Sequence, residues 1–283
     1  MTDWSHLLTR VDSLIDRLEQ FLPAARPNTD WSAPAFYWRN GASGGYLESV
    51  NNPHHIALDA LQNIDQQKNA VLRNTAQFAA GKPANNVLLT GSRGTGKSTL
   101  IKACWYQFKD SVKLIEIDKP DLSSLGELLQ QISDRPERFI IYCDDLSFEE
   151  GDHHYKALKS ALDGSIRAPG ENILFYATSN RRHLLPQKMS ENLETTQTNG
   201  EIRPGDSIEE KISLAERFGL WLSFYPFSQD EYLAAARFWV EDMGGSWDDD
   251  MRTAALRWNM SRGSRSGRVA WQFARDTIGA MGL

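Results

Sequence analysis

The sequence predicts an α/β protein whose core is a five-stranded parallel sheet with helices on both faces. Between residues 87 and 224, five short apolar runs rich in β-forming residues alternate with helical stretches, as is typical of parallel sheets. No strand signal follows residue 227, and three helical stretches predict a helical C-terminal part. We expect three regions: an N-terminal helix and loop extension over residues 1–56, an α/β core over residues 57–226 and a helical region over residues 227–283.

The N-terminal region is predicted to contain one amphipathic helix and a long loop. Apolar residues at helical spacing predict a helix over residues 4–22, which Pro23 and Pro27 end because proline lacks the N–H that a helix needs. Residues 24–55 are predicted to be a loop, in which the aromatic run 36–38 with Arg39 is a candidate docking patch for a partner. A second helix is expected over residues 57–80, closed by Gly81 and Pro83.

The core elements follow in regular alternation. Strands are predicted over residues 87–90, 112–117, 139–143, 173–178 and 220–224, and helices over residues 97–108, 122–132, 153–162 and 207–218. Ser228 and Glu231 form a capping-box pattern that opens a helix ending at residue 240. Two further helices are expected over residues 248–260 and 266–278.

Composition and charge narrow the function classes. The 283 residues carry 37 acidic against 31 basic side chains, a net charge of −6, whereas proteins that grip nucleic acid mainly by its phosphates usually carry the opposite sign. No apolar run approaches the ~18 residues that span a bilayer, and the first residues show no secretory signal pattern. We therefore expect a cytoplasmic protein with no membrane partner.

Residues 91–98 match the phosphate-binding loop pattern and lie where that loop must lie, between a strand and the start of a helix. Glycines let successive backbone N–H groups turn toward phosphates, and the helix dipole favours the anion. Lys97 would supply a positive charge, and the Ser98 hydroxyl would be a ligand for Mg²⁺. The candidate cofactor-binding residues are Gly91, Ser92, Arg93, Gly94, Thr95, Gly96, Lys97, Ser98 and Thr99.

Polar side chains end the two strands that should flank this loop. An apolar strand ends in Asp144 and Asp145, of which the first is the candidate metal ligand and the second the candidate general base. Glu149 and Glu150 are rival bases. The strand over residues 173–178 is followed by Asn180, whose amide could hydrogen-bond the attacking water and sense the γ-phosphate.

With these residues the chain resembles the AAA+ ATPase superfamily, and most closely the bacterial family of predicted ATPases labelled domain of unknown function 815. The resemblance runs from about Leu58 to Phe273 and is carried by residues 74–78, 84–98, 143–149, 177–185 and 266–270. It implies an α/β core, a small helical lid over residues 227–283, and ATP hydrolysis coupled to lid movement. It also implies that Arg217 is an arginine finger and Arg268 the second sensor of the lid, with Arg265 as a substitute for Arg268.

Two positions depart from the superfamily pattern. Most members carry Glu after the metal-binding Asp, whereas Asp145 is one methylene shorter, which favours slow hydrolysis. The segment expected to touch adenine usually contains Gly, and here it reads Leu-Gln-Asn-Ile-Asp over residues 61–65.

The resemblance, together with these residues, implies a Mg²⁺-dependent, ATP-hydrolysing protein that acts on a macromolecule, either protein or nucleic acid. The resemblance implies a homo-oligomer such as a hexameric ring. Lys97, Asp145, Asn180, Arg217 and Arg268 are the candidate catalytic residues, and Ser98 and Asp144 the candidate metal ligands. Two alternatives stay open. One is an ATP-dependent switch with little hydrolysis, and the other is a small-molecule kinase, whose lid would normally interrupt the core.

Overall fold

The computed structural model describes residues 27–54, 56–148, 152–163, 171–181, 196–198, 201–203, 214 and 216–282, with residues 4, 8, 10, 11 and 13. Those five isolated residues are helical, and the rest of the helix predicted over residues 4–22 lies outside the described residues. Most of the helix predicted over residues 207–218 and the rival bases Glu149 and Glu150 also lie outside them.

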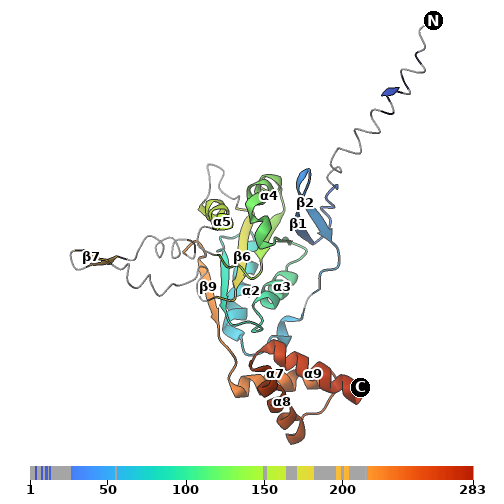
Figure 1. The fold of residues 1–283 in the computed structure, drawn as a ribbon, viewed down its shortest axis with the longest axis vertical. Coiled ribbons are helices and arrows are strands. Elements are labelled where there is room, and N and C mark those ends of the chain that lie inside the picture. The colour runs from blue at the N-terminus through green and yellow to red at the C-terminus, as the bar shows by residue number, and fades with distance from the viewer. Residues whose placement is uncertain are drawn as a thin grey trace.

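The predicted α/β fold with a parallel sheet and a helical C-terminal part is confirmed, but the sheet has seven strands instead of five (Figure 1). The strands are β1 (Ala35–Gly41), β2 (Gly44–Val50), β3 (Val87–Gly91), β4 (Val112–Glu116), β5 (Arg138–Cys143), β6 (Ile173–Ser179) and β9 (Leu220–Phe224). Their order is β2-β1-β4-β5-β6-β3-β9, and the five predicted strands are parallel neighbours. A separate pair, β7 (Thr196–Thr198) and β8 (Glu201–Arg203), is antiparallel.

The two additional strands correct the loop predicted over residues 24–55. β1 and β2 form an antiparallel hairpin, and β1 pairs in parallel with β4, so the hairpin extends the sheet at one edge (Figure 1). Phe36 and Trp38 alternate along β1 onto one face and are fully buried, and the Trp38 indole N–H donates to the Ser124 hydroxyl at 2.8 Å. Phe36 and Trp38 are therefore core residues and not part of an exposed docking patch, because burying large apolar rings is favourable.

Helices cover both faces of the sheet. One hydrophobic cluster joins the sheet to α2 (Asp65–Ala79) and α3 (Lys97–Tyr106). Another joins the opposite face to η2 (Lys119–Ser124), α4 (Leu125–Ile132) and α5 (His153–Asp163). The single helix predicted over residues 57–80 is instead a short turn, η1 (Leu58–Ala60), and then α2, because the chain bends at Asn63, whose φ is +63°.

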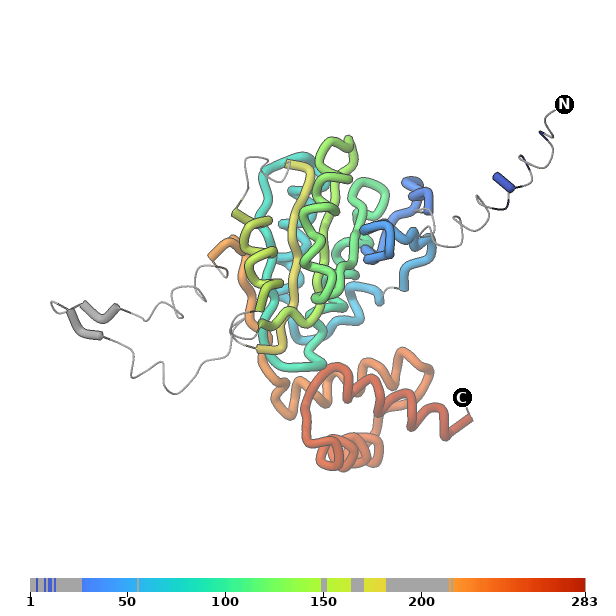
Figure 2. Tube along the Cα trace, turned by 45° about the horizontal axis from the view of Figure 1, so that its top comes forward, coloured from blue at the N-terminus to red at the C-terminus, as the bar shows by residue number. Residues whose placement is uncertain are grey.

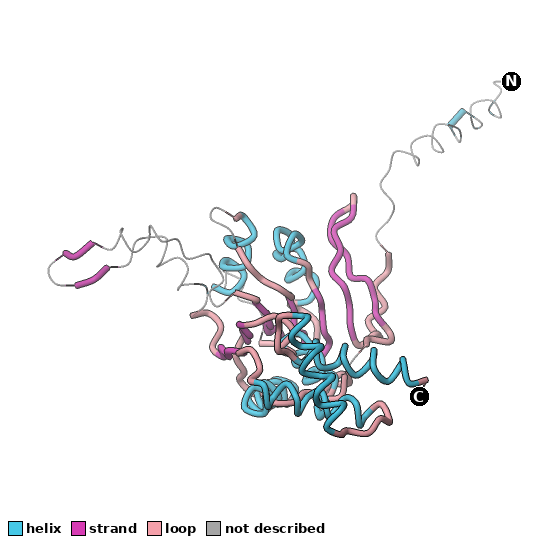
Figure 3. The backbone as a smooth tube through the Cα atoms, turned by 60° about the horizontal axis from the view of Figure 1, so that its bottom comes forward, coloured by secondary structure: helices cyan, strands magenta, loops and turns pink. Residues whose placement is uncertain are grey.

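The C-terminal helices form a small domain with its own core, below the sheet in Figure 2 and toward the viewer in Figure 3. They are α7 (Gln229–Asp242), α8 (Asp249–Arg262) and α9 (Gly267–Met281). The predicted capping box of α7 is present: Ser228 and Glu231 each accept a backbone N–H of the other. Among the residues that the structure describes, no helix is both long enough and apolar enough to cross a bilayer.

Candidate nucleotide-binding site

The glycine-rich loop joins the end of β3 to the start of α3, as its sequence predicts. Three of its glycines have left-handed φ values, +128° at Gly91, +77° at Gly94 and +96° at Gly96. A side chain at Gly91 would also place its Cβ 1.9 Å from the Phe224 carbonyl oxygen on β9. Glycine is therefore required by both backbone conformation and space, and the loop leads into the N-terminus of α3, where free backbone N–H groups favour an anion.

Lys97 lies at the centre of the site and is 5% exposed. Its ammonium donates hydrogen bonds to the carbonyl oxygens of Gly91 at 2.8 Å and Ser92 at 2.7 Å, and to Asn180 Oδ1 at 3.0 Å. Burial lowers the pKa of Lys97 to about 8, although the carboxylates of Asp144 and Asp145 act in the opposite direction. This lysine is a desolvated cation beside the phosphate-binding loop.

Asp144 lies opposite the first turn of α3. Its Oδ1 accepts hydrogen bonds from the Ser98 hydroxyl at 2.6 Å and from the Thr178 hydroxyl on β6. Burial alone would raise the pKa of Asp144, but the hydrogen bonds from Ser98 and Thr178 hold it below its ordinary value. An ionised carboxylate and a hydroxyl thus lie side by side, and oxygen ligands of this kind are those that Mg²⁺ prefers.

Asp145 is linked to Lys97 through the side-chain amide of Asn180. Asn180 donates from Nδ2 to Asp145 Oδ1 at 2.7 Å, while its Oδ1 accepts from Lys97. The Arg93 guanidinium is 3.9 Å from the other carboxylate oxygen of Asp145. The backbone of Asp145 has a φ of +49°, and its N–H donates to the Thr178 hydroxyl at 3.0 Å. The ends of β5 and β6 therefore hold both aspartates and Asn180 in one hydrogen-bonded network.

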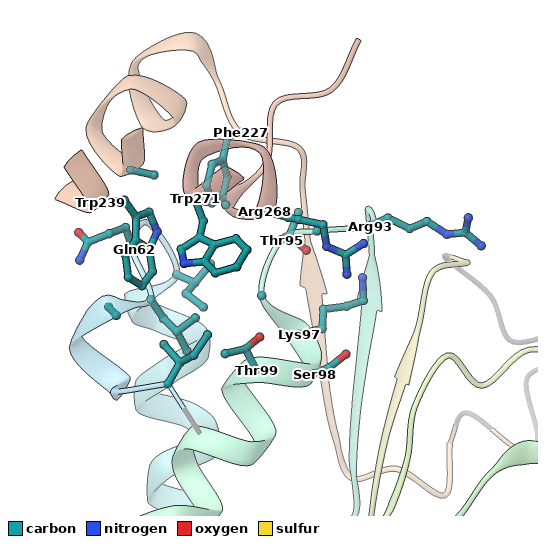
Figure 4. A pocket seen from close by; sticks show the side chains of 18 of the residues that line it. Gln62, Arg93, Thr95, Lys97, Ser98, Thr99, Phe227, Trp239, Arg268 and Trp271 are labelled. Carbon is teal, nitrogen blue, oxygen red and sulfur yellow. The ribbon is translucent and has the colours of Figure 1, made fainter. Parts of the chain in front are cut away.

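A cavity of about 790 Å³ extends from this network to the C-terminal helices (Figure 4). On the side away from Lys97 its lining is largely apolar, and Trp239 and Trp271 project into it from the C-terminal domain. Further lining residues are His54, Ile56, Ala60, Leu61, Gln62, Ile64, Phe227, Ala235, Gly267 and Arg275. A site with one charged end and one aromatic end suits a ligand that has both phosphate and ring parts.

The sequence interpretation missed the two tryptophans and Arg275. A signal for two of them exists in the spacing of α9, because residues 268, 271 and 275 are three and four apart and so share one face of the helix. Trp239 lies on α7 and carries no comparable local signal. The Arg275 guanidinium also lies 4.7 Å from the centre of a Trp271 ring.

Arg268 lines the cavity and is also tied to the phosphate-binding loop. Its backbone N–H donates to the Gly94 carbonyl at 3.1 Å. A Cβ at Gly94 would lie 2.7 Å from the buried Ser266 hydroxyl oxygen, so the loop and the start of α9 are in close contact. Arg265 is absent from the described lining of the cavity, and its carbonyl instead accepts the Phe227 N–H. Of the two arginines, only Arg268 is positioned to face a ligand.

Three residues of the segment over residues 61–65 line the cavity, Leu61, Gln62 and Ile64, and Asn63 explains why the segment needs no glycine. Asn63 takes the left-handed conformation that glycine would supply, and asparagine tolerates that conformation better than most residues. Its side-chain amide donates to the Glu231 carbonyl on α7 at 2.9 Å. The asparagine thus both turns the chain and links the segment to the C-terminal domain.

Arg217 lies apart from the cavity of its own chain. It occupies a turn just before β9, and its guanidinium forms an ion pair with Asp163 at the end of α5. The structure therefore brings together all of the predicted site residues except Arg217. Within the loop over residues 91–99, Gly91 and Ser92 do not line the cavity, and their carbonyl oxygens instead accept hydrogen bonds from Lys97.

A parallel α/β sheet with a phosphate-binding loop at the carboxyl end of its strands, closed by a helical domain, has the fold of the AAA+ nucleotide-binding proteins. Solved structures that share this fold include the following two. The RuvB Holliday junction branch migration motor of Thermotoga maritima is 18% identical, with a TM-score of 0.52 over 80% of this chain and 66% of that chain. Orc1 of Aeropyrum pernix in complex with DNA is 16% identical, with a TM-score of 0.55 over 79% of this chain and 62% of that one.

At these identities the likeness concerns the fold alone, and the chain spans about two thirds of the length of either relative. A search of the curated proteins finds no match. The family model described as "Protein of unknown function (DUF815)" matches residues 31–281, and the chain belongs to that family.

Proposed function

We propose that this protein binds ATP with Mg²⁺ in the cavity beneath the C-terminal helices, hydrolyses it, and uses the cycle to act on a macromolecule in the cytoplasm. The observation that carries the proposal is the continuous network from Lys97 through Asn180 to Asp145, with Asp144 and Ser98 beside it. The charged end of the cavity would hold the phosphates, and the apolar end with Trp239 and Trp271 would hold the base.

The donor set fits Mg²⁺. Ser98 and Asp144 would hold the ion, because the low pKa of Asp144 keeps its carboxylate charged while the Ser98 oxygen lies next to it. The ion, when bound, would neutralise charge on the phosphate oxygens. Asp145 would then polarise the attacking water as general base, Asn180 would orient it, and Lys97 with Arg268 would stabilise negative charge on the phosphates.

The site would be completed by a second copy of the chain. Arg217 lies outside its own cavity, so an arginine finger at this position would have to reach the γ-phosphate of a neighbour. We therefore propose a homo-oligomer, such as a hexameric ring, whose substrate is a protein or a nucleic acid.

An ATP-dependent switch with little hydrolysis is the second candidate. It is favoured by Asp145, whose side chain is shorter than glutamate and whose Oδ1 is already engaged by Asn180 at 2.7 Å. A small-molecule kinase is less well supported, because α7, α8 and α9 follow the last strand of the sheet and do not interrupt the core.

A steady-state assay of phosphate release, run with and without cell extract, separates these candidates. Continuous release of inorganic phosphate from ATP, stimulated by a macromolecular fraction, supports the proposed function. Tight ATP binding without release in any fraction supports the switch. Phosphate transfer that requires a dialysable component of the extract would support the kinase.

We expect the affinity for ATP to fall as the pH rises above about 8. Phosphates prefer the ammonium form of Lys97, whose pKa is lowered by burial to about 8, so above that pH binding must take up a proton. The affinity should then fall by up to about tenfold for each pH unit. Calorimetric titration from about pH 7 to 9.5, in buffers of different ionisation enthalpy, measures both the affinity and the proton uptake.

Lys102→Ala is the matched control, because Lys102 lies five residues further along α3 and pairs with Glu116 at 2.9 Å. Its pH profile should equal that of the wild type. An affinity that stays constant across this range, with no proton uptake, contradicts the assignment of Lys97 as the phosphate-binding cation.

A further inference from the structure

Two tyrosines lie side by side in the sheet but differ in what their hydroxyls contact. Tyr142 on β5 and Tyr176 on β6 are register partners, and both are at most 1% exposed. The Tyr176 hydroxyl contacts Thr75 at 2.9 Å and Asn74 at 3.1 Å. The Tyr142 hydroxyl has no hydrogen-bond partner among the residues that the structure describes. A buried hydroxyl without a hydrogen-bond partner destabilises the fold, so such groups are rare unless they have a role.

The Tyr142 hydroxyl lies next to the proposed metal ligands. Tyr142 packs on the face of the sheet that α3 covers, and Asp144, the residue that follows β5, also faces α3 through its hydrogen bond with Ser98. The Tyr142 ring packs against the first turns of α3, where the Lys102 ammonium lies 5.3 Å from the ring centre. A phenol is a hydrogen-bond donor at neutral pH, and this one lies on the side of the sheet where Ser98 of α3 meets Asp144.

We infer that Tyr142 is a positioning residue for Mg²⁺, whose hydroxyl donates to the Asp144 carboxylate when the ion is bound. The inference rests on the proposed function and adds a residue to it. Ser98 and Thr178 already donate to Asp144 Oδ1, so the Tyr142 hydroxyl as a third donor would fix the orientation of the carboxylate toward the ion. Groups that hydrogen-bond a metal ligand set its orientation, and their removal typically weakens metal binding by about 10- to 100-fold.

The test compares Tyr142→Phe with Tyr176→Phe. Binding of a non-hydrolysable ATP analogue is titrated by calorimetry in EDTA and at increasing Mg²⁺ concentration, and thermal unfolding is followed without any ligand. Tyr142→Phe should unfold at the wild-type temperature or higher, because it removes an unpartnered hydroxyl. It should need about tenfold or more Mg²⁺ for half-maximal enhancement of binding, with unchanged affinity in EDTA.

Tyr176→Phe should behave in the opposite way. It should lower the unfolding temperature, because it leaves Thr75 and Asn74 without the hydroxyl that both contact, and it should keep the wild-type Mg²⁺ dependence. If Tyr142→Phe shows the wild-type Mg²⁺ dependence, the hydroxyl has no role toward the ion and the inference is overturned. If the wild type binds no analogue, the proposed function itself has failed. If it binds the analogue without enhancement by Mg²⁺, the proposed metal site has failed.

Discussion

Arg217→Ala should lower the rate of ATP hydrolysis by about 10³-fold or more while leaving the affinity for ATP unchanged. An arginine finger supplied by a neighbour is worth about 10³–10⁵ in turnover in other NTPases. Arg217 does not line the cavity of its own chain, so its loss should not affect binding there. Turnover per subunit in the wild type should also rise with protein concentration, because the complete site requires two copies. Phosphate-release assays over a range of concentrations measure both effects.

Asp163→Ala is the control for an ordinary structural role of Arg217. Asp163 is the ion-pair partner of Arg217 within the chain, so a structural pair would give both variants the same phenotype. The finger role predicts loss of turnover for Arg217→Ala only. Mixing Arg217→Ala with Lys97→Ala should partly restore activity, since some interfaces then pair an intact cavity with an intact finger. No rescue, together with turnover that is independent of protein concentration, would show that Arg217 is an ordinary structural cation and not an arginine finger.

Asp145→Asn should abolish turnover and keep the binding of ATP with Mg²⁺. Only the charge that polarises water is lost, and a general base contributes about 10²–10⁴-fold to the rate. Asparagine tolerates the left-handed backbone at this position, where φ is +49°, so the local fold should persist. Single-turnover kinetics separate the chemical step from binding.

Asp144→Asn is the informative comparison, because it should weaken the Mg²⁺ dependence and turnover together. Asn at 144 can still accept hydrogen bonds from Ser98 and Thr178 but no longer carries the charge that attracts the ion. Normal hydrolysis by Asp145→Asn, with loss of hydrolysis in Glu149→Gln, would show that the general base is Glu149.

The core of the fold and most of the site could be predicted because their signals are local. The spacing of Gly91, Gly96 and Lys97 fixes a loop between a strand and a helix, and the carboxyl ends of parallel strands meet at one edge of the sheet. Asp145 and Asn180 follow β5 and β6, which are neighbours in the sheet, so their meeting beside Lys97 follows from topology.

The hairpin formed by β1 and β2 was not predicted, although β1 does carry a strand signal. Phe36 and Trp38 alternate with Tyr37 and Arg39, a period-two pattern of a strand with one buried face. The close approach of Gly45 to the Trp38 ring, where a Cβ would lie 1.9 Å away, depends on a pairing that local sequence does not reveal. Trp239 likewise reaches the cavity only through the packing of α7 against α9.

The central claim is that the loop over residues 91–99 is an ATP site, and calorimetric titration of ATP with Mg²⁺ into the wild type and Lys97→Ala tests it most directly. Because burial disfavours the Lys97 charge, removing it should leave the fold intact, which circular dichroism checks. The wild type should bind one ATP per chain, and the variant should lose about 2–5 kcal/mol of binding free energy, roughly 30-fold or more in affinity. Wild-type affinity in a folded Lys97→Ala protein would contradict the account.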